Sequence, residues 1–284
     1  MYICIMLGYL AQITSVFLFG VSNSLWAKPI RVIPFYLAIF YRTLVSFSFF
    51  AILVIVFDFS VNASFTSYLN TFFLASIASF GLYFFTKGIS MSSTSLVVTI
   101  TASSFLFGQL TSIFILGENP KPLHLLTIIL FLGAIILTDW KSVVTFKITR
   151  GTKFGLLAAL IWGVTFPLLS VSSKSIGFIQ TSFIVETCVL IMSLFFSLKL
   201  LRSLKSPNPI NLIWFFSLGI LAALGLLLQY FAYTLIPVHK AVAISSLTHL
   251  IAIASSVLFF KETVNNKIKI AAFLGALGVI STIL

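Results

Sequence analysis

The chain has 284 residues, of which 60% are hydrophobic and only 8% are charged, and its mean hydropathy is +1.18. A soluble domain carries about 25% charged residues, so this composition excludes a protein whose whole surface meets water. The net charge of +12 comes from basic residues scattered at the ends of apolar segments, which favours topology-setting loop charges and no nucleic-acid partner.

Apolar segments follow one another along the chain, each suited to a helix of roughly 20 residues that crosses a bilayer. Runs such as "FSFFAILVIVF" and "LLTIILFLGAIIL" lack the alternation of a membrane β-barrel. The spans are predicted at residues 4–26, 34–57, 68–88, 93–116, 122–139, 153–173, 178–200, 210–235, 239–260 and 267–284. The sequence therefore predicts an all-α integral membrane protein with ten transmembrane helices in a lipid bilayer.

The first of these segments reads as a retained span, because it lacks a basic n-region and exceeds the apolar length of a signal peptide. Prolines fall in or beside the predicted loops, with one exception. Pro167 lies well inside the predicted span 153–173, where it removes a backbone donor and should bend the helix.

The chain divides almost at its middle, at the polar stretch from Lys141 to Lys153. We expect a first five-helix repeat over residues 1–140, a linker over 141–152 and a second repeat over 153–284. A shift of 144 residues aligns Gly81 with Gly225, Glu118 with Glu262, and Arg42 with Glu186, and a shift of 143 aligns "FGV" with "WGV". Because five is odd, the second half must enter the membrane from the opposite side, which makes the repeat inverted.

Four segments carry a resemblance to a known family. They are "FGVSNSLWAK" and "WGVTFPLLS" in the first span of each half, and "LGENPKPLHLLTIILFLGAIIL" and "FKETVNNKIKIAAFLGALGVI" at the joints between the fourth and fifth spans. With them the chain resembles the drug/metabolite transporter superfamily, in its ten-helix EamA-type branch, over essentially its whole length.

The repeat of that family shows W-G near its start and L-G-E before its last helix. Here the first half has Phe19-Gly20 in place of W-G, and the second half has Phe260-Lys261-Glu262 in place of L-G-E. The resemblance implies the fold and the transport of small organic solutes. It does not say which, since the superfamily handles amino acids, nucleotide derivatives, sugars and drugs.

Basic residues divide unequally between the two membrane faces. Face A, which bears the N-terminus, holds three in its predicted loops, and face B holds thirteen. The positive-inside rule makes face B cytoplasmic and places both termini outside, whereas the family resemblance implies that both termini are cytoplasmic. We favour the charge count, because it belongs to this sequence, and we expect a multi-pass protein of the bacterial inner membrane.

Arg42 and Glu186 are charged residues within predicted spans. Each lies about eight residues into its span, roughly 12 Å deep, and a charge there usually faces a cavity or a partner. The inverted repeat makes their helices antiparallel, so the two side chains are expected to approach near the midplane. Two roles stay open. One is functional, either binding of a zwitterionic or anionic solute or relay of a proton by Glu186, and the other is a buried ion pair that locks the halves together.

Other candidate binding residues are polar or aromatic side chains within apolar spans. Gln229 and Tyr233 share a helix face by their i, i+4 spacing, and His249 lies in the ninth predicted span. Tyr83 and Trp162 are candidates for stacking on a solute, although large aromatics more often fill helix interfaces. Further polar residues are Gln12, Ser15, Ser22, Asn23, Ser245 and Ser256, for which hydrogen bonding between helices is the expected role.

Two carboxylates precede the last predicted helix of each half. Glu118 and Glu262 are expected to cap those helices, since a carboxylate favours the positive end of the helix dipole. A stripe of small residues at Gly151, Gly155, Ala159 and Gly163 favours close helix packing, either within the chain or across a dimer, so both a monomer and a homodimer stay open.

The function predicted from these features is secondary transport of a small organic metabolite by alternating access, with export preferred to uptake. The solute class is an amino acid or a similar compound, with drug-like solutes included. A membrane-embedded enzyme is disfavoured, because no H-E-x-x-H motif, paired-carboxylate spacing or phosphate loop is present. Cys4 and Cys188 lie in apolar segments, and we expect neither catalytic residues nor metal or cofactor. The alternative is a non-transporting membrane scaffold.

Overall fold

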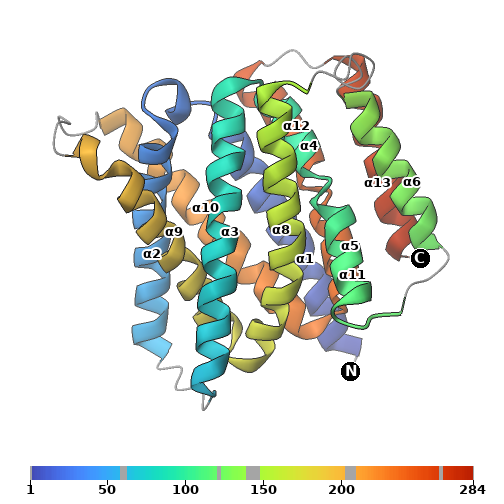
Figure 1. Ribbon diagram of the computed structural model, residues 1–284, viewed down its shortest axis with the longest axis horizontal. Helices are drawn as coiled ribbons and strands as arrows, with labels where there is room; N and C mark the ends of the chain where they lie inside the picture. The colour runs from blue at the N-terminus through green and yellow to red at the C-terminus, as the bar shows by residue number, and fades with distance from the viewer. Residues whose placement is uncertain are drawn as a thin grey trace.

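The computed structural model describes residues 2–57, 63–119, 123–138, 148–201, 209–261 and 265–283 (Figure 1). The first half contains α1 (Tyr2–Leu25), η1 (Pro29–Arg31), α2 (Phe35–Phe57), α3 (Phe65–Met91), α4 (Thr94–Thr101), α5 (Ser104–Phe114) and α6 (Leu123–Thr138). The second half contains α8 (Arg150–Ser175), α9 (Phe178–Leu201), α10 (Pro209–Leu235), α11 (Val238–Ser245), α12 (Thr248–Phe260) and α13 (Asn266–Ile283). Pro167 lies inside α8, which continues through it.

These helices confirm the predicted fold class of ten spans in two inverted five-helix repeats. Within the described ranges, 8 helical segments are long and apolar enough to cross a membrane, and α6 and α13 complete the fifth and tenth positions. Figure 1 shows α1 rising from the N-terminus and α13 descending to the C-terminus, so the first and last helices run in opposite directions across the view.

The fourth and ninth spans lie where the sequence predicts them, but neither is one uninterrupted helix. The structure divides them into α4 with α5 and into α11 with α12. At the divisions, the Ser103 and Leu247 amides donate to carbonyls only three residues earlier, both at 3.0 Å. The Ser103 hydroxyl donates to the Ile100 carbonyl at 2.7 Å and the Ser246 hydroxyl to the Ala243 carbonyl at 2.6 Å, and such bonds compete with regular helix bonding.

The two divisions are equivalent in the repeat. Adding 144 to the bounds of α4, residues 94 and 101, gives the bounds of α11, residues 238 and 245. The same shift carries the first residue of α5 onto the first residue of α12. An internal symmetry that was weak in the sequence is therefore regular in the structure.

The two halves pack against each other rather than forming separate bundles. α1 lies on α10 and α12, while α8 lies on α3, α4 and α5. α2 packs on α9, and α6 packs on α13 at one edge of the molecule (Figure 1). Most of the buried surface of each span therefore comes from the other half of the chain.

The glycine of the F-G and W-G pairs makes this interlocking possible. A Cβ on Gly163 of α8 would lie 2.6 Å from the Ser104 carbonyl oxygen, and a Cβ on Gly20 of α1 would lie 3.0 Å from that of Thr248. Ser104 and Thr248 are the first residues of α5 and α12. The first span of each half therefore approaches the divided span of the other half closely, and only glycine allows that approach.

The small-residue stripe on α8 serves packing within the chain. All four of its residues are buried. A Cβ on Gly151 would meet the Ser92 side chain at 2.4 Å, and a Cβ on Gly155 would meet Ile100 at 3.1 Å. The stripe is thus covered by α3, α4 and α5 and is not available as a dimer face.

Candidate functional site: a cavity between the repeats

A cavity of about 160 Å³ lies between the two halves and is lined by every spanning helix of the described chain except α6 and α13. Its wall contains eight pairs of residues that are 144 positions apart. These are Ser22 with Phe166, Arg42 with Glu186, Ala78 with Ala222, Leu82 with Leu226, Phe85 with Gln229, Thr101 with Ser245, Ala102 with Ser246, and Ser104 with Thr248. Equivalent residues of the two halves therefore line the same cavity, and residues from both helix divisions lie in its wall.

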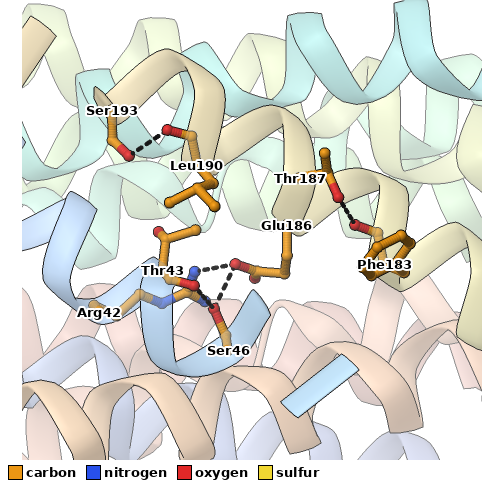
Figure 2. A network of polar contacts seen from close by, with 8 residues as sticks. All are labelled: Arg42, Thr43, Ser46, Phe183, Glu186, Thr187, Leu190 and Ser193. Atoms are coloured by element: carbon orange, nitrogen blue, oxygen red, sulfur yellow. Dashed lines mark hydrogen bonds and ion pairs between the residues drawn. The ribbon is translucent and has the colours of Figure 1, made fainter. Parts of the chain in front are cut away.

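Arg42 and Glu186 meet in this wall (Figure 2). Nη1 of Arg42 donates to Oε2 of Glu186 at 2.6 Å, and the Ser46 hydroxyl donates to the same oxygen at 2.6 Å. The side chains of the ion pair are only 6% and 3% exposed. The repeat equivalent of Ser46 is Leu190, so the hydroxyl that supports the carboxylate exists in one half alone.

This ion pair uses only part of its bonding capacity. Within the described residues, Arg42 makes a single hydrogen bond, and no donor reaches Oε1 of Glu186. An arginine and a carboxylate more often form two parallel bonds. The remaining guanidinium N–H groups and Oε1 are therefore available to a molecule in the cavity, with opposite charges side by side.

Gln229, His249 and Trp162 also line the cavity. Nε2 of Gln229 donates to the Tyr233 hydroxyl at 2.7 Å, and Nδ1 of His249 contacts the Ser246 carbonyl. Nε1 of Trp162 donates to the Ala78 carbonyl at 3.1 Å, which fixes the indole plane in the wall. Each of these side chains is thus oriented by a neighbour while it faces the cavity.

Tyr83 and Tyr233 are not in the cavity wall. Tyr83 packs its ring against Phe35 and Phe196, with Nζ of Lys87 5.6 Å from the ring centroid. Tyr233 is 1% exposed and lies behind Gln229. Tyr83 is directed away because α3 turns Leu82 and Phe85 toward the cavity, and Tyr233 acts on the wall only through its hydrogen bonds.

Comparison with known proteins decides the family. The model of the EamA-like transporter family matches residues 6–139 and again residues 149–284. The chain belongs to the EamA-like transporter family. It is therefore a multi-pass membrane protein of a family that transports small molecules.

A solved structure described as "Crystal structure of protein" has the same fold as this EamA-like transporter. It superposes with a TM-score of 0.71 over 98% of this chain and 96% of its own, at 14% sequence identity. No curated protein matches the chain.

Four aromatic residues of the transporter's cavity were not predicted from the sequence. They are Phe19 of α1, Trp26 just after α1, Phe85 of α3 and Phe166 of α8. Two signals were present in the sequence: Phe85 is the repeat equivalent of Gln229, and Phe166 follows Trp162 by one helical turn. The rings of Trp162 and Phe166 stack at 5.7 Å with an interplanar angle of 15°.

Glu118 caps a helix, but a different one from that predicted. Its two carboxylate oxygens accept from the backbone amides of Val238 and His239, each at 2.9 Å, at the start of α11 in the other half. Nδ1 of His239 lies 2.8 Å from Oε2. Burial acts to raise the pKa of Glu118, but these hydrogen bonds outweigh it and the pKa is lowered. The expected counterpart, Glu262, lies outside the described residues.

Proposed function

We propose that this EamA-like transporter moves a small zwitterionic metabolite, an amino acid or a similar compound, by alternating access and in the direction of export. The observation that carries the proposal is the buried, singly bonded Arg42–Glu186 pair in the wall of the cavity. Its free guanidinium N–H groups match a carboxylate and Oε1 of Glu186 matches an ammonium group. A zwitterion satisfies both without leaving net charge inside the membrane.

The rest of the wall supports a solute that also carries an apolar or aromatic group. Phe19, Trp26, Phe85, Trp162 and Phe166 supply aromatic surface around the ion pair. Small polar side chains at the helix divisions also line the cavity, where they would bind an uncharged polar group of the solute. This combination of apolar walls and a few placed polar groups is typical of small-molecule sites.

Alternating access is supported by the symmetry of the cavity. Because its wall is made of repeat-equivalent pairs, exchanging the conformations of the two halves would open the same site to the opposite face. Along the first span, the lining runs from Ser15 to Trp26, which lies just past the face-B end of α1. If face B is cytoplasmic, as the loop charges favour, a solute enters from the cytoplasm, which supports export across a bacterial inner membrane. The oligomeric state that fits is a monomer or a homodimer.

The test is counterflow in proteoliposomes that contain the purified full chain, with and without a pH gradient. A panel would compare zwitterionic amino acids of different side-chain size with the matching amines and the matching carboxylic acids. We expect exchange of zwitterions and little of either singly charged analogue. Exchange of only the amines or only the acids would contradict the zwitterion, and no exchange of any solute would favour a scaffold.

A further inference from the structure

Tyr230 of α10 carries a buried hydroxyl group that has no hydrogen-bond partner in the described part of the chain. The residue is 0% exposed. Its neighbours Leu226 and Gln229 line the cavity, and its side chain packs in the same buried cluster as Val185, the residue before Glu186. The hydroxyl of Tyr233, one turn further along, is by contrast bonded to Gln229 at 2.7 Å.

An unpartnered hydroxyl in this position is unfavourable in the conformation described. Burying a hydroxyl group without a hydrogen bond is costly, and phenylalanine would fill nearly the same volume without that cost. The chain uses phenylalanine freely, at 32 positions. A tyrosine at position 230 is therefore explained best by a second conformation in which its hydroxyl finds an acceptor.

We propose that Tyr230 is the alternative partner of Glu186 when the transporter holds its solute. The solute carboxylate draws the Arg42 guanidinium group away from Glu186, and Oε2 of Glu186 accepts a hydrogen bond from the Tyr230 hydroxyl in its place. Oε1 stays directed at the solute ammonium. This proposal rests on the zwitterion-binding function proposed above and makes Tyr230 a positioning residue, because it acts on the solute through Glu186.

The exchange solves a specific problem of binding. A solute carboxylate that forms two parallel bonds with the free edge of Arg42 competes with Glu186 for the guanidinium group and weakens the bond from Nη1 to Oε2. Oε2, which stays buried, then needs a second donor besides the Ser46 hydroxyl, and the lack of one would oppose binding. The hydroxyl of Tyr230 supplies that donor from α10, which packs against both α9 and α2.

A double-mutant cycle tests the exchange without any solute. In the wild-type background, Tyr230→Phe should leave the unfolding temperature of the purified chain unchanged or raise it, since it removes an unpartnered hydroxyl. In an Arg42→Met background, the Glu186 carboxylate has lost the bond from Arg42 and accepts one from the Tyr230 hydroxyl. The same change should therefore lower the unfolding temperature. Equal shifts in the two backgrounds would overturn the proposal. Ser46→Ala removes the other donor to Oε2 and supplies the same cycle should the Arg42→Met protein not fold.

Tyr233→Phe is the matched control, because it removes a hydroxyl that is already bonded. It should lower the unfolding temperature by a similar amount in both backgrounds.

Transport supplies the second measurement. In counterflow, Tyr230→Phe should raise the half-saturation concentration for a transported zwitterion about tenfold, the loss expected for a hydrogen bond to a charged group. An unchanged half-saturation concentration would overturn the exchange. A wild-type chain that moves no zwitterion would refute the proposed function, while the stability cycle would still decide whether Tyr230 and Glu186 form a pair.

Discussion

Arg42 and Glu186 stabilise each other, because a single charge inside the membrane is costly without a partner of opposite sign. An isolated charge at the centre of a span costs about 2.5–3.5 kcal/mol on insertion scales, and both side chains are buried. A pair that served only to join the halves would be expected to use both carboxylate oxygens, whereas here Oε2 alone accepts from Arg42 and Ser46. The unused bonding capacity supports the proposed binding role of the pair over a purely structural one.

A double mutant separates these two roles. Arg42→Met alone should destabilise the protein by about 3–5 kcal/mol, because it strands a buried carboxylate. Arg42→Met combined with Glu186→Leu should restore the unfolding temperature, measured in detergent, yet abolish counterflow of every zwitterion. A stable double mutant with near-normal transport would show that the pair is structural, and would leave Gln229 and His249 as the better candidates for the site.

At the scale of the elements, interlocking of the two halves depends on close helix contacts and on one capping carboxylate. The helix divisions at α4–α5 and α11–α12 place the starts of α5 and α12 against Gly163 and Gly20 of the opposite half. Glu118, just beyond α5, then caps α11. Each contact joins segments that are far apart in the sequence.

Gly163→Ala should destabilise the protein by about 1–3 kcal/mol, the usual range for overpacking, because the added Cβ would lie 2.4 Å from Cβ of Phe107 and 2.6 Å from the Ser104 carbonyl oxygen. The control is Gly133→Ala in α6, where an added Cβ has no atom within 4 Å. That change should be neutral or stabilise the helix by up to about 1 kcal/mol. Thermal unfolding of both variants measures the difference, and equal effects would contradict the close approach.

Glu118→Gln should lower stability at neutral pH by about 1 kcal/mol, because it weakens the cap at the start of α11. The pKa of Glu118 in the folded protein is below its ordinary value of 4.5. The carboxylate therefore contributes stability above that value, and the contribution is lost as the pH falls through the folded-state pKa. The unfolding temperatures of wild type and Glu118→Gln should converge in acid. A difference in unfolding temperature between the two proteins that stays constant from pH 7 to below the folded-state pKa would contradict capping by an ionised Glu118.

At the scale of the whole molecule, the odd number of spans in each half determines the topology. It directs the two halves oppositely, and ten spans are expected to leave both termini on the same face of the membrane. The cavity is then the place where equivalent residues of the two halves meet.

Accessibility of introduced cysteines tests this topology and its orientation. In a chain with Cys4→Ser, cysteines placed before Tyr2 and after Leu284 should label from the same face, and a cysteine near Lys147 from the other. The charge distribution predicts that the Lys147 face is cytoplasmic, since basic loops are retained there. Opposite labelling of the two termini would contradict the inverted repeat, and a periplasmic Lys147 would support the orientation implied by the family.

The sequence by itself determined the class of the protein, the positions of its spans, their inverted repetition and the alignment of Arg42 with Glu186. These follow from hydropathy and residue spacing, which are properties of a single chain read in order. Only the tertiary structure decided that the fourth and ninth spans divide, that Glu118 caps α11, that Phe85 and Trp26 face the cavity, and that Tyr83 does not. Those features depend on which helices meet and at what distance. In an apolar span nearly every face is hydrophobic, so the pattern of side chains does not distinguish lipid, helix or cavity as the neighbour.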